Sequence, residues 1–135
     1  MKFNKKLTAL IGGAVCLGFM SVSMAASKLK PFVLASESAG DVASVTAATK
    51  SKLTGAGFTV VGEYDPASGA HIIAVTNDAL KAAAAKSEFG AYGAAVRVGV
   101  TKAGGKVQVT YSNPTYWAAG FRMKSNLASV GKSLE

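Results

Sequence analysis

The sequence predicts an α+β fold in which an antiparallel sheet has helices packed on one face, in the order β-α-β-β-α-β-β-α. Three observations lead to this prediction. Short runs rich in β-branched residues lie between turn residues, as strands do. Other segments begin with a capping Asp or Asn and repeat apolar residues at helical spacing. The last pair of runs, 96–101 and 107–112, alternates apolar and polar residues on either side of a glycine pair.

The opening strand and the first helix are predicted over residues 32–55. The apolar run 32–35 follows a Lys-Pro step and favours a strand. Residues 38–41 break this strand and supply helix-capping side chains. Gly55 and Gly57 suit the end of the helix, because glycine accepts the left-handed conformation. One face of the helix is formed by Val42, Val45, Thr49 and Leu53.

A hairpin is predicted next. Residues 58–64 are rich in β-branched and aromatic side chains, and residues 71–76 continue in the same way. Between them, residues 65–69 include Pro66, which presets φ, and Gly69, which accepts positive φ. These residue types predict two antiparallel strands joined by a turn.

The second helix is predicted to begin at the capping pair Asn77-Asp78. Leu80 and the alanines at 82–85 give this helix a strong propensity but a thin apolar face. Residues 88–93 contain two glycines and are expected to form an irregular connection to the next strand.

The last hairpin has a register that can be predicted. With Gly104-Gly105 as a two-residue turn, Val100 faces Val109 and Val98 faces Tyr111, so both apolar rows share one face. A three-residue loop would place Val100 against Gln108 and would break this agreement. We therefore expect one buried and one wetter face of the sheet.

One final helix is predicted from Asn113-Pro114 onward, with Asn as cap and Pro in the first turn. Gly131 is a candidate end of this helix, which would then stop before the last residue of its apolar stripe, Leu134. The stripe consists of Tyr116, Gly120, Met123, Leu127, Val130 and Leu134.

The amino terminus is typical of a cleaved secretory signal. Its lysines at 2, 5 and 6 precede an apolar run at 7–22 that is too short for a membrane span, and Ser23-Met24-Ala25 offers a peptidase site. We expect cleavage after Ala25 or Ala26, so residues 1–25 form the signal and residues 26–135 a single α+β domain. The expected location is the periplasm, with secretion into the medium as the alternative.

Residues 104–114 read Gly-Gly-Lys-Val-Gln-Val-Thr-Tyr-Ser-Asn-Pro. They resemble the closing segment of the domain of unknown function 302 family, in which a strand of the type GKVWVSYNDP leads into an Asn/Asp-Pro step. The resemblance covers about residues 40–120. It implies a compact α+β domain, β-α-β-β-β-β-α in outline and sometimes dimeric, with no established reaction and no catalytic residues to carry over. The chain departs from the family pattern in its export signal and in a last helix that stops at Glu135, which leaves open that it is a shortened relative of longer exported members.

The position of the single cysteine and the distribution of charge exclude several classes of function. Cys16 lies in the signal, and Val15 before it does not suit a lipoprotein site, so we expect a mature protein without cysteine, disulfides or thiolate chemistry. The formal net charge of +8 falls by three when the signal leaves, and the remaining lysines are scattered. We therefore expect no nucleic-acid partner, and no stable membrane span in the mature protein.

Candidates for catalysis are sparse. His71 is the single histidine, and without a second histidine or a cysteine it does not complete a metal shell. The acidic residues Asp65, Asp78, Glu63 and Glu88 are spread over predicted turns and helix ends. No nucleophile motif surrounds any serine. We assign no catalytic residue, no metal and no cofactor, and we do not expect an enzyme.

One dense cluster lies where the last strand meets the last helix. Aromatic rings there either form the core seam that docks the helix on the sheet, which we favour, or line an apolar pocket with convergent polar groups. In the second case Arg97 and Arg122 would pair with an anionic head group. The candidate ligand-binding residues are Tyr111, Asn113, Tyr116, Trp117, Phe121, Arg122 and Arg97.

The function that we expect is non-enzymatic binding of a small apolar or amphipathic ligand or of a protein partner. One alternative is a structural protein of the cell envelope that forms a homodimer or larger assembly through a sheet edge or the alanine-rich helix. Another alternative is an enzyme of unrecognised type.

Overall fold

The computed structural model describes residues 28–135. The expected signal, its cleavage site and Cys16 lie outside the described residues. The elements in chain order are β1 (Phe32–Ser38), α1 (Val42–Gly55), β2 (Thr59–Ala67), β3 (Ala70–Thr76), α2 (Asp78–Ala85), a short 3₁₀ helix η1 (Gly90–Gly93), β4 (Val96–Ala103), β5 (Lys106–Ser112), α3 (Pro114–Gly120) and α4 (Ala128–Ser133).

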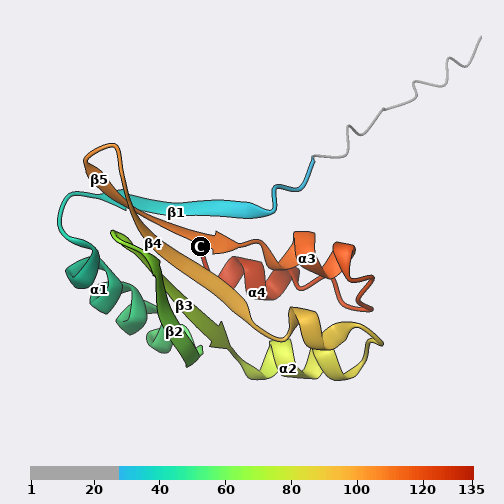
Figure 1. Cartoon of the computed structure of the whole chain (residues 1–135). Coiled ribbons are helices and arrows are strands. Elements are labelled where there is room, and N and C mark those ends of the chain that lie inside the picture. Colours follow the sequence, from blue (N-terminus) through green and yellow to red (C-terminus); the bar gives the residue numbers. More distant parts are fainter. Residues whose placement is uncertain (1–27) are drawn as a thin grey trace, which may run out of the picture.

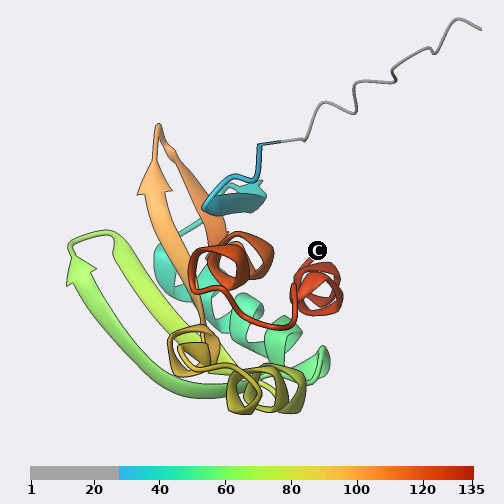
Figure 2. The same ribbon diagram turned by 90° about the vertical axis from the view of Figure 1, so that its right-hand side faces the viewer.

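The five strands form one antiparallel sheet in the order β1-β5-β4-β3-β2 (Figure 1). Seen from the side, the helices lie together on one side of this sheet (Figure 2). The predicted fold class, an antiparallel sheet with helices on one face, is therefore confirmed. No helix among residues 28–135 combines the length and the hydropathy that crossing a membrane requires.

The register of the last hairpin is confirmed. Val100 pairs with Val109 and Val98 with Tyr111, and all four side chains are buried. The neighbouring strand β3 adds Ile73 and Val75 to the same face. The core between this face and the helices is completed from the helices and loops by Leu53, Phe58, Leu80, Ala83, Ala118, Leu127 and Val130.

The predicted helix caps are present. The side chain of Asp41 accepts from the Ser44 N–H at 2.9 Å, and that of Asn77 accepts from the Leu80 N–H at 2.9 Å. Asn113 accepts from the Thr115 N–H at 3.1 Å, with Pro114 in the first turn. Short polar side chains thus start α1, α2 and α3 where the sequence indicates.

The prediction of a single final helix is wrong, because the chain forms α3 and α4 with a break between them. Arg122 and Leu127 adopt φ of 52° and 55°, which interrupts the helical ladder. Ser125 Oγ and Asn126 Oδ1 accept from nearby backbone N–H groups, at Leu127 and Ala128 respectively, and so compete with helical bonds. The break still buries Leu127, which belongs to the predicted stripe.

The turn expected at 65–69 is shorter in the structure. Strand β2 runs to Ala67, so only Ser68 and Gly69 form the turn, and Gly69 takes a φ of 76°. Asp65 therefore lies on a strand rather than in a loop. This difference places its carboxylate beside β3.

Candidate functional site

A cavity of about 390 Å³ lies where the predicted ligand cluster is found. It opens at the end of the sheet where β3 ends, β4 begins and β5 leads into α3. The residues that line it are mainly apolar or aromatic, which is typical of small-molecule sites. They are Ala74, Leu80, Tyr92, Gly93, Ala95, Val96, Arg97, Ser112, Pro114, Trp117, Phe121 and Leu127.

Three of these side chains form an aromatic stack along one wall of the cavity. The rings of Tyr92 and Phe121 lie 5.4 Å apart, and those of Phe121 and Trp117 lie 5.7 Å apart. Tyr116 meets Trp117 edge-on at 5.3 Å from outside the cavity lining. Such offset and edge contacts hold large rings in fixed orientations.

The polar groups of the cavity are few. Trp117 Nε1 is buried and has no hydrogen-bond partner among the described residues. Ser112 Oγ accepts from the backbone N–H of Arg97 at 3.0 Å, which ties β5 to β4 beside the cavity. Arg97 lines the cavity with an exposed side chain, and it also lines a hollow beside Tyr64 and Ile72 on the face of the sheet without helices. The wall of the cavity thus includes a tryptophan whose indole N–H is covered and unpaired among residues 28–135, and Arg97 borders it.

Of the seven residues predicted to bind a ligand, the structure brings Arg97, Trp117 and Phe121 to this cavity. Tyr116 packs behind Trp117. The other three lie elsewhere, and their positions are described next. Tyr92, which completes the stack, was missed, although its place between two glycines in the irregular connection was a signal for an exposed functional residue.

Tyr111 is buried in the core, where loss of water contact, with a contribution from the charge of Glu135, raises its pKa above the usual value. Asn113 serves the backbone, because it caps α3 and its Nδ2 donates to the Lys30 carbonyl at 2.9 Å. Arg122 lines a different hollow, together with Leu29 and Lys124. These three residues therefore do not contribute to the cavity.

A second and larger concavity was not expected from the sequence. This groove, of about 880 Å³, lies between α1 and the hairpin of β2 and β3. Its lining is apolar on the side of the helix and polar on the side of the hairpin. The lining residues are Val42, Ala43, Thr46, Ala47, Lys50, Glu63, Asp65, Ala67, Ser68, Gly69, Ala70 and His71.

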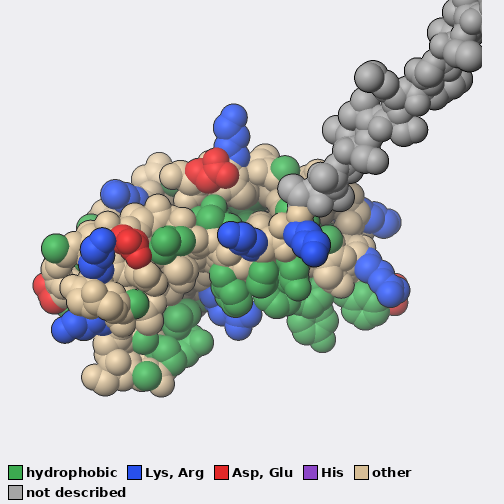
Figure 3. All heavy atoms as spheres, turned by 90° about the horizontal axis from the view of Figure 1, so that it is seen from above, with side chains coloured by type: hydrophobic (Ala, Val, Ile, Leu, Met, Phe, Trp, Pro, Cys, Tyr) green, Lys and Arg blue, Asp and Glu red, His purple; other side chains and the backbone are tan. Residues whose placement is uncertain are grey.

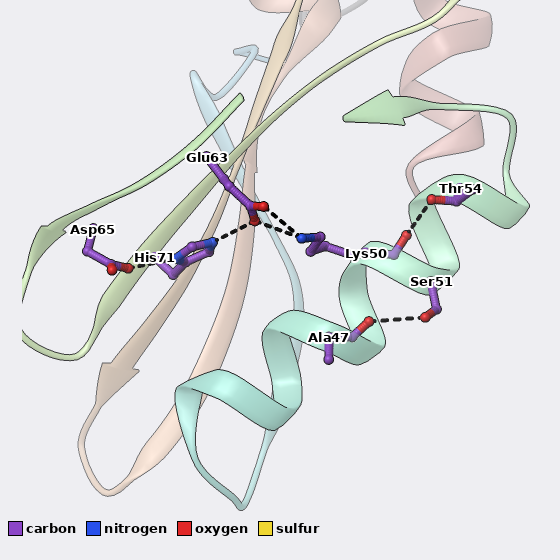
Figure 4. Close-up of polar contacts among 7 residues, drawn as sticks. All are labelled: Ala47, Lys50, Ser51, Thr54, Glu63, Asp65 and His71. Atoms are coloured by element: carbon purple, nitrogen blue, oxygen red, sulfur yellow. Dashed lines mark hydrogen bonds and ion pairs between the residues drawn. The ribbon is translucent and has the colours of Figure 1, made fainter. Parts of the chain in front are cut away.

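Four charged or titratable side chains form a chain of contacts in this groove (Figure 4). His71 Nδ1 lies 2.6 Å from Asp65 Oδ1, and its Nε2 lies 3.1 Å from Glu63 Oε2. From α1, Lys50 Nζ donates to both oxygens of Glu63, at 2.8 and 2.9 Å. The extension of β2 to Ala67 is what brings Asp65 to the ring of His71.

These contacts shift the pKa values of His71 and Glu63. Hydrogen bonds that the His71 ring donates to Asp65 and then to Glu63 raise its pKa above the usual 6.5. Hydrogen bonds from Lys50 and then His71 lower the pKa of Glu63 below its usual 4.5. Both shifts follow from hydrogen bonding to the charged form of the group. The cluster therefore favours a protonated histidine next to ionised carboxylates.

The arrangement limits the chemistry of His71. A general base needs a free ring nitrogen toward its substrate, but both nitrogens of His71 face carboxylates. The two carboxylates lie on opposite sides of the ring, so one metal ion would not contact all three groups. Over residues 28–135 no group of three or more His, Cys, Asp or Glu residues is arranged to hold a metal ion.

Comparisons with known proteins bear on the fold alone. No protein-family model matches the sequence, and the search of curated proteins gives no match. Among solved structures, the chain is similar to the crystal structure of an uncharacterised conserved protein of the DUF302 group from Bacillus stearothermophilus. The TM-score is 0.68 at 15% sequence identity, and the match covers 78% of this chain and 94% of the other. The resemblance inferred from residues 104–114 is thus confirmed as a likeness of fold.

Proposed function

We propose that this protein is an exported domain that binds a small amphipathic molecule in the cavity beside Trp117. One observation carries the proposal: Trp117, whose buried indole N–H has no acceptor within residues 28–135, lines an aromatic cavity. An unpaired buried donor costs about 1–3 kcal/mol, and a ligand oxygen placed there would offset this cost. Within the described residues, the cavity lining includes no histidine and no carboxylate, which favours binding over catalysis.

The chemistry of the lining indicates the ligand class. Leu80, Phe121 and Leu127 offer an apolar surface to a hydrocarbon body. Arg97 stands at the exposed side and is suited to a carboxylate or a similar anionic head group. An aliphatic carboxylate of medium length has both features, together with oxygens that accept from Trp117 Nε1.

Trp117 is the single tryptophan of the chain, so its fluorescence reports on the cavity directly. We expect decanoate, added below its micellar concentration, to change the emission saturably. Arg97→Gln should weaken the binding of decanoate about fivefold, as for a partly exposed charge pair, and should affect decanol little. Arg122→Gln is the matched control, since Arg122 lies at another hollow. An unchanged emission, or equal effects of the two arginine variants, would contradict the proposal.

A second candidate function, assembly with a second copy of the chain, is favoured by the face of the sheet that the helices leave open. A row of paired residues crosses all five strands on this face, and both of its ends, Leu34 and Tyr64, are more than half exposed. Figure 3 shows hydrophobic side chains gathered along the side of the molecule that faces the viewer in Figure 1. Two such faces could bury each other in a homodimer.

Sedimentation velocity separates the two candidates. If the open face mediates assembly, the protein sediments as a dimer and Tyr64→Lys shifts it to the monomer. Lys102→Glu, which changes a charge outside that row, is the control. A strict monomer at high protein concentration would remove this second candidate and leave ligand binding untouched.

A further inference from the structure

The groove between α1 and the β2–β3 hairpin contains a hydroxyl group that departs from the pattern of its helix. Thr49, Ser51 and Thr54 each donate a hydrogen bond to the carbonyl four residues earlier, at 2.7, 3.1 and 2.9 Å. Thr46 lies in the same helix and is 8% exposed, yet its Oγ1 has no partner among the described residues. Thr46 lines the groove, but its Oγ1 is itself covered, so a bound molecule would reach this hydroxyl only after a rotation of the Thr46 side chain.

The shape of the groove suits a small organic molecule. Its volume of about 880 Å³ lies within the range of ligand pockets. The α1 wall is built from small apolar side chains, among them Val42, Ala43 and Ala47, so an apolar body can lie close to the helix. The opposite wall carries Glu63, Asp65 and His71 from the hairpin. An amphipathic ligand would therefore have to present its polar end to the hairpin.

The charges on the polar wall decide the sign of that polar end. With His71 neutral, Lys50 balances one carboxylate and one net negative charge remains. Asp65 uses Oδ1 toward His71, and the structure gives its Oδ2 no partner within residues 28–135. The Asp65 side chain is 74% exposed, so the free oxygen is accessible. Unused hydrogen-bond acceptors and negative charge both favour a cationic donor.

We propose that this groove binds a small organic ammonium ion. Its ammonium group donates to Asp65 and Glu63, and its apolar body packs along the α1 wall, where Thr46 offers one further hydrogen bond. This site is separate from the cavity beside Trp117, and it takes a ligand of opposite charge. Neither site depends on the other, so each can fail alone.

The proposal also sets a dependence on pH. A protonated His71 is itself a cation between the same two carboxylates, and among the described residues that line the groove Lys50 is the remaining charged group. Protonation of His71 therefore leaves the polar wall with no net charge and competes with the ligand. Binding of an ammonium ion should strengthen as the pH rises through the titration of His71, and it should weaken again where the amine itself loses its proton.

The test is a titration of the ¹⁵N-labelled protein, followed by backbone amide shifts, with three probes of equal length: hexylammonium, hexanol and hexanoate. At pH 8.5 we expect hexylammonium to bind most tightly and to shift amides of α1 and of the hairpin. Asp65→Asn should weaken it about tenfold. Thr46→Val should weaken it about fivefold, as for the loss of one hydrogen bond.

Thr49→Val is the matched control, because the Thr49 hydroxyl already bonds within its helix, and it should leave binding unchanged. Lowering the pH to 5.5 should weaken hexylammonium and should leave hexanol unaffected. Equal binding of the three probes, preference for hexanoate, shifts confined to residues around Trp117, or no shifts at all would each overturn the proposal.

Discussion

The indole of Trp117 has two opposite effects on stability: its ring packing stabilises the fold, and its N–H destabilises it. Its ring stacks on Phe121 and meets Tyr116, which anchors α3 over the end of the sheet. Its N–H is buried and finds no acceptor in the described part of the chain, which costs stability as long as the cavity supplies none. Under the proposed function, a ligand oxygen supplies the acceptor that this N–H lacks.

The two roles of Trp117 can be separated by substitution. Trp117→Phe keeps a stacked ring and removes the unpaired N–H, so the free energy of unfolding should change by less than about 1 kcal/mol. Trp117→Ala removes the ring as well and should cost about 3 kcal/mol. Urea denaturation measures both. If Trp117→Phe were as destabilising as Trp117→Ala, the N–H would have an essential structural role, and the ligand interpretation would lose its main support.

His71 makes the stability of the fold depend on pH. Its pKa is raised in the folded state by Asp65 and Glu63, so its contribution is complete below the unfolded value of about 6.5 and is lost as the pH rises through the raised value. Glu63 has a lowered pKa, so its contribution is complete above about 4.5 and is lost as the pH falls through the lowered value.

We therefore expect stability to decline as the pH rises from about 6.5 through the raised pKa of His71, and His71→Gln to remove this decline. Chemical denaturation at a series of pH values measures the effect, with Asp41→Asn as a control that leaves the histidine in place. A wild-type profile that stays flat over this interval would show that the contacts of His71 do not form in solution.

This cluster shows what the sequence does not reveal at the residue scale. Pro66 and Gly69 correctly indicate a turn, but residue types do not determine how far β2 continues before it. Three more strand residues bring Asp65 next to His71, and Lys50 reaches Glu63 from a helix thirteen positions away along the chain. Such a meeting depends on tertiary packing, which a single sequence does not encode by local pattern.

At the scale of elements, the connection after α2 is held by a close approach of the backbone. A Cβ added at Gly90 would clash with the backbone carbonyl of Ala84 in α2. The glycine lets η1 fold back on α2, and η1 carries Tyr92 to the aromatic stack. One glycine thereby positions one wall of the cavity.

Substitution of Gly90 should therefore be costly. Gly90→Ala is expected to destabilise the protein by about 3 kcal/mol through overpacking. Gly120→Ala is the matched control, since a Cβ there meets nothing within 4 Å, and it should be neutral or stabilising by up to about 1 kcal/mol. Thermal unfolding of both variants checks the pair. Equal melting temperatures would mean that η1 does not pack on α2 as described.

In the predicted final helix, the buried side chains were predicted correctly, whereas the single continuous helix was not. Met123, Leu127 and Val130 do face the core, as their spacing indicates. The chain reaches this packing through two short helices, because Ser125 and Asn126 bind the backbone locally and Leu127 turns to positive φ. Periodicity reports which side chains are buried, whereas the continuity of the helix depends on a few competing hydrogen bonds.

At the scale of the whole molecule, the antiparallel sheet could be predicted because its alternation is strict. A register shift by one residue would turn the buried Val98 and Val100 to the open face, so the pattern leaves a single consistent pairing. No comparable sequence pattern indicates the groove between α1 and the β2–β3 hairpin. It arises where the N-terminal half of a helix with small side chains meets the edge of a hairpin, and neither element alone indicates a site.

Export also belongs to this scale, and it remains a prediction. Lysines followed by an apolar run and a small-residue step predict that the intact amino terminus is absent from the folded protein. Mass spectrometry of protein recovered from a bacterial host should find a chain that begins at Ala26 or Ser27, in the periplasmic fraction. An unprocessed Met1 on cytosolic material would contradict the assignment.

The most direct test of ligand binding beside Trp117 is a crystal structure of the protein grown with decanoate. We predict continuous density in the cavity where β5 leads into α3, with a carboxylate oxygen within hydrogen-bond distance of Trp117 Nε1 and the chain packed against Leu80 and Phe121. An empty cavity at saturating decanoate, or one closed by the side chains of Tyr92 and Phe121, would contradict the account.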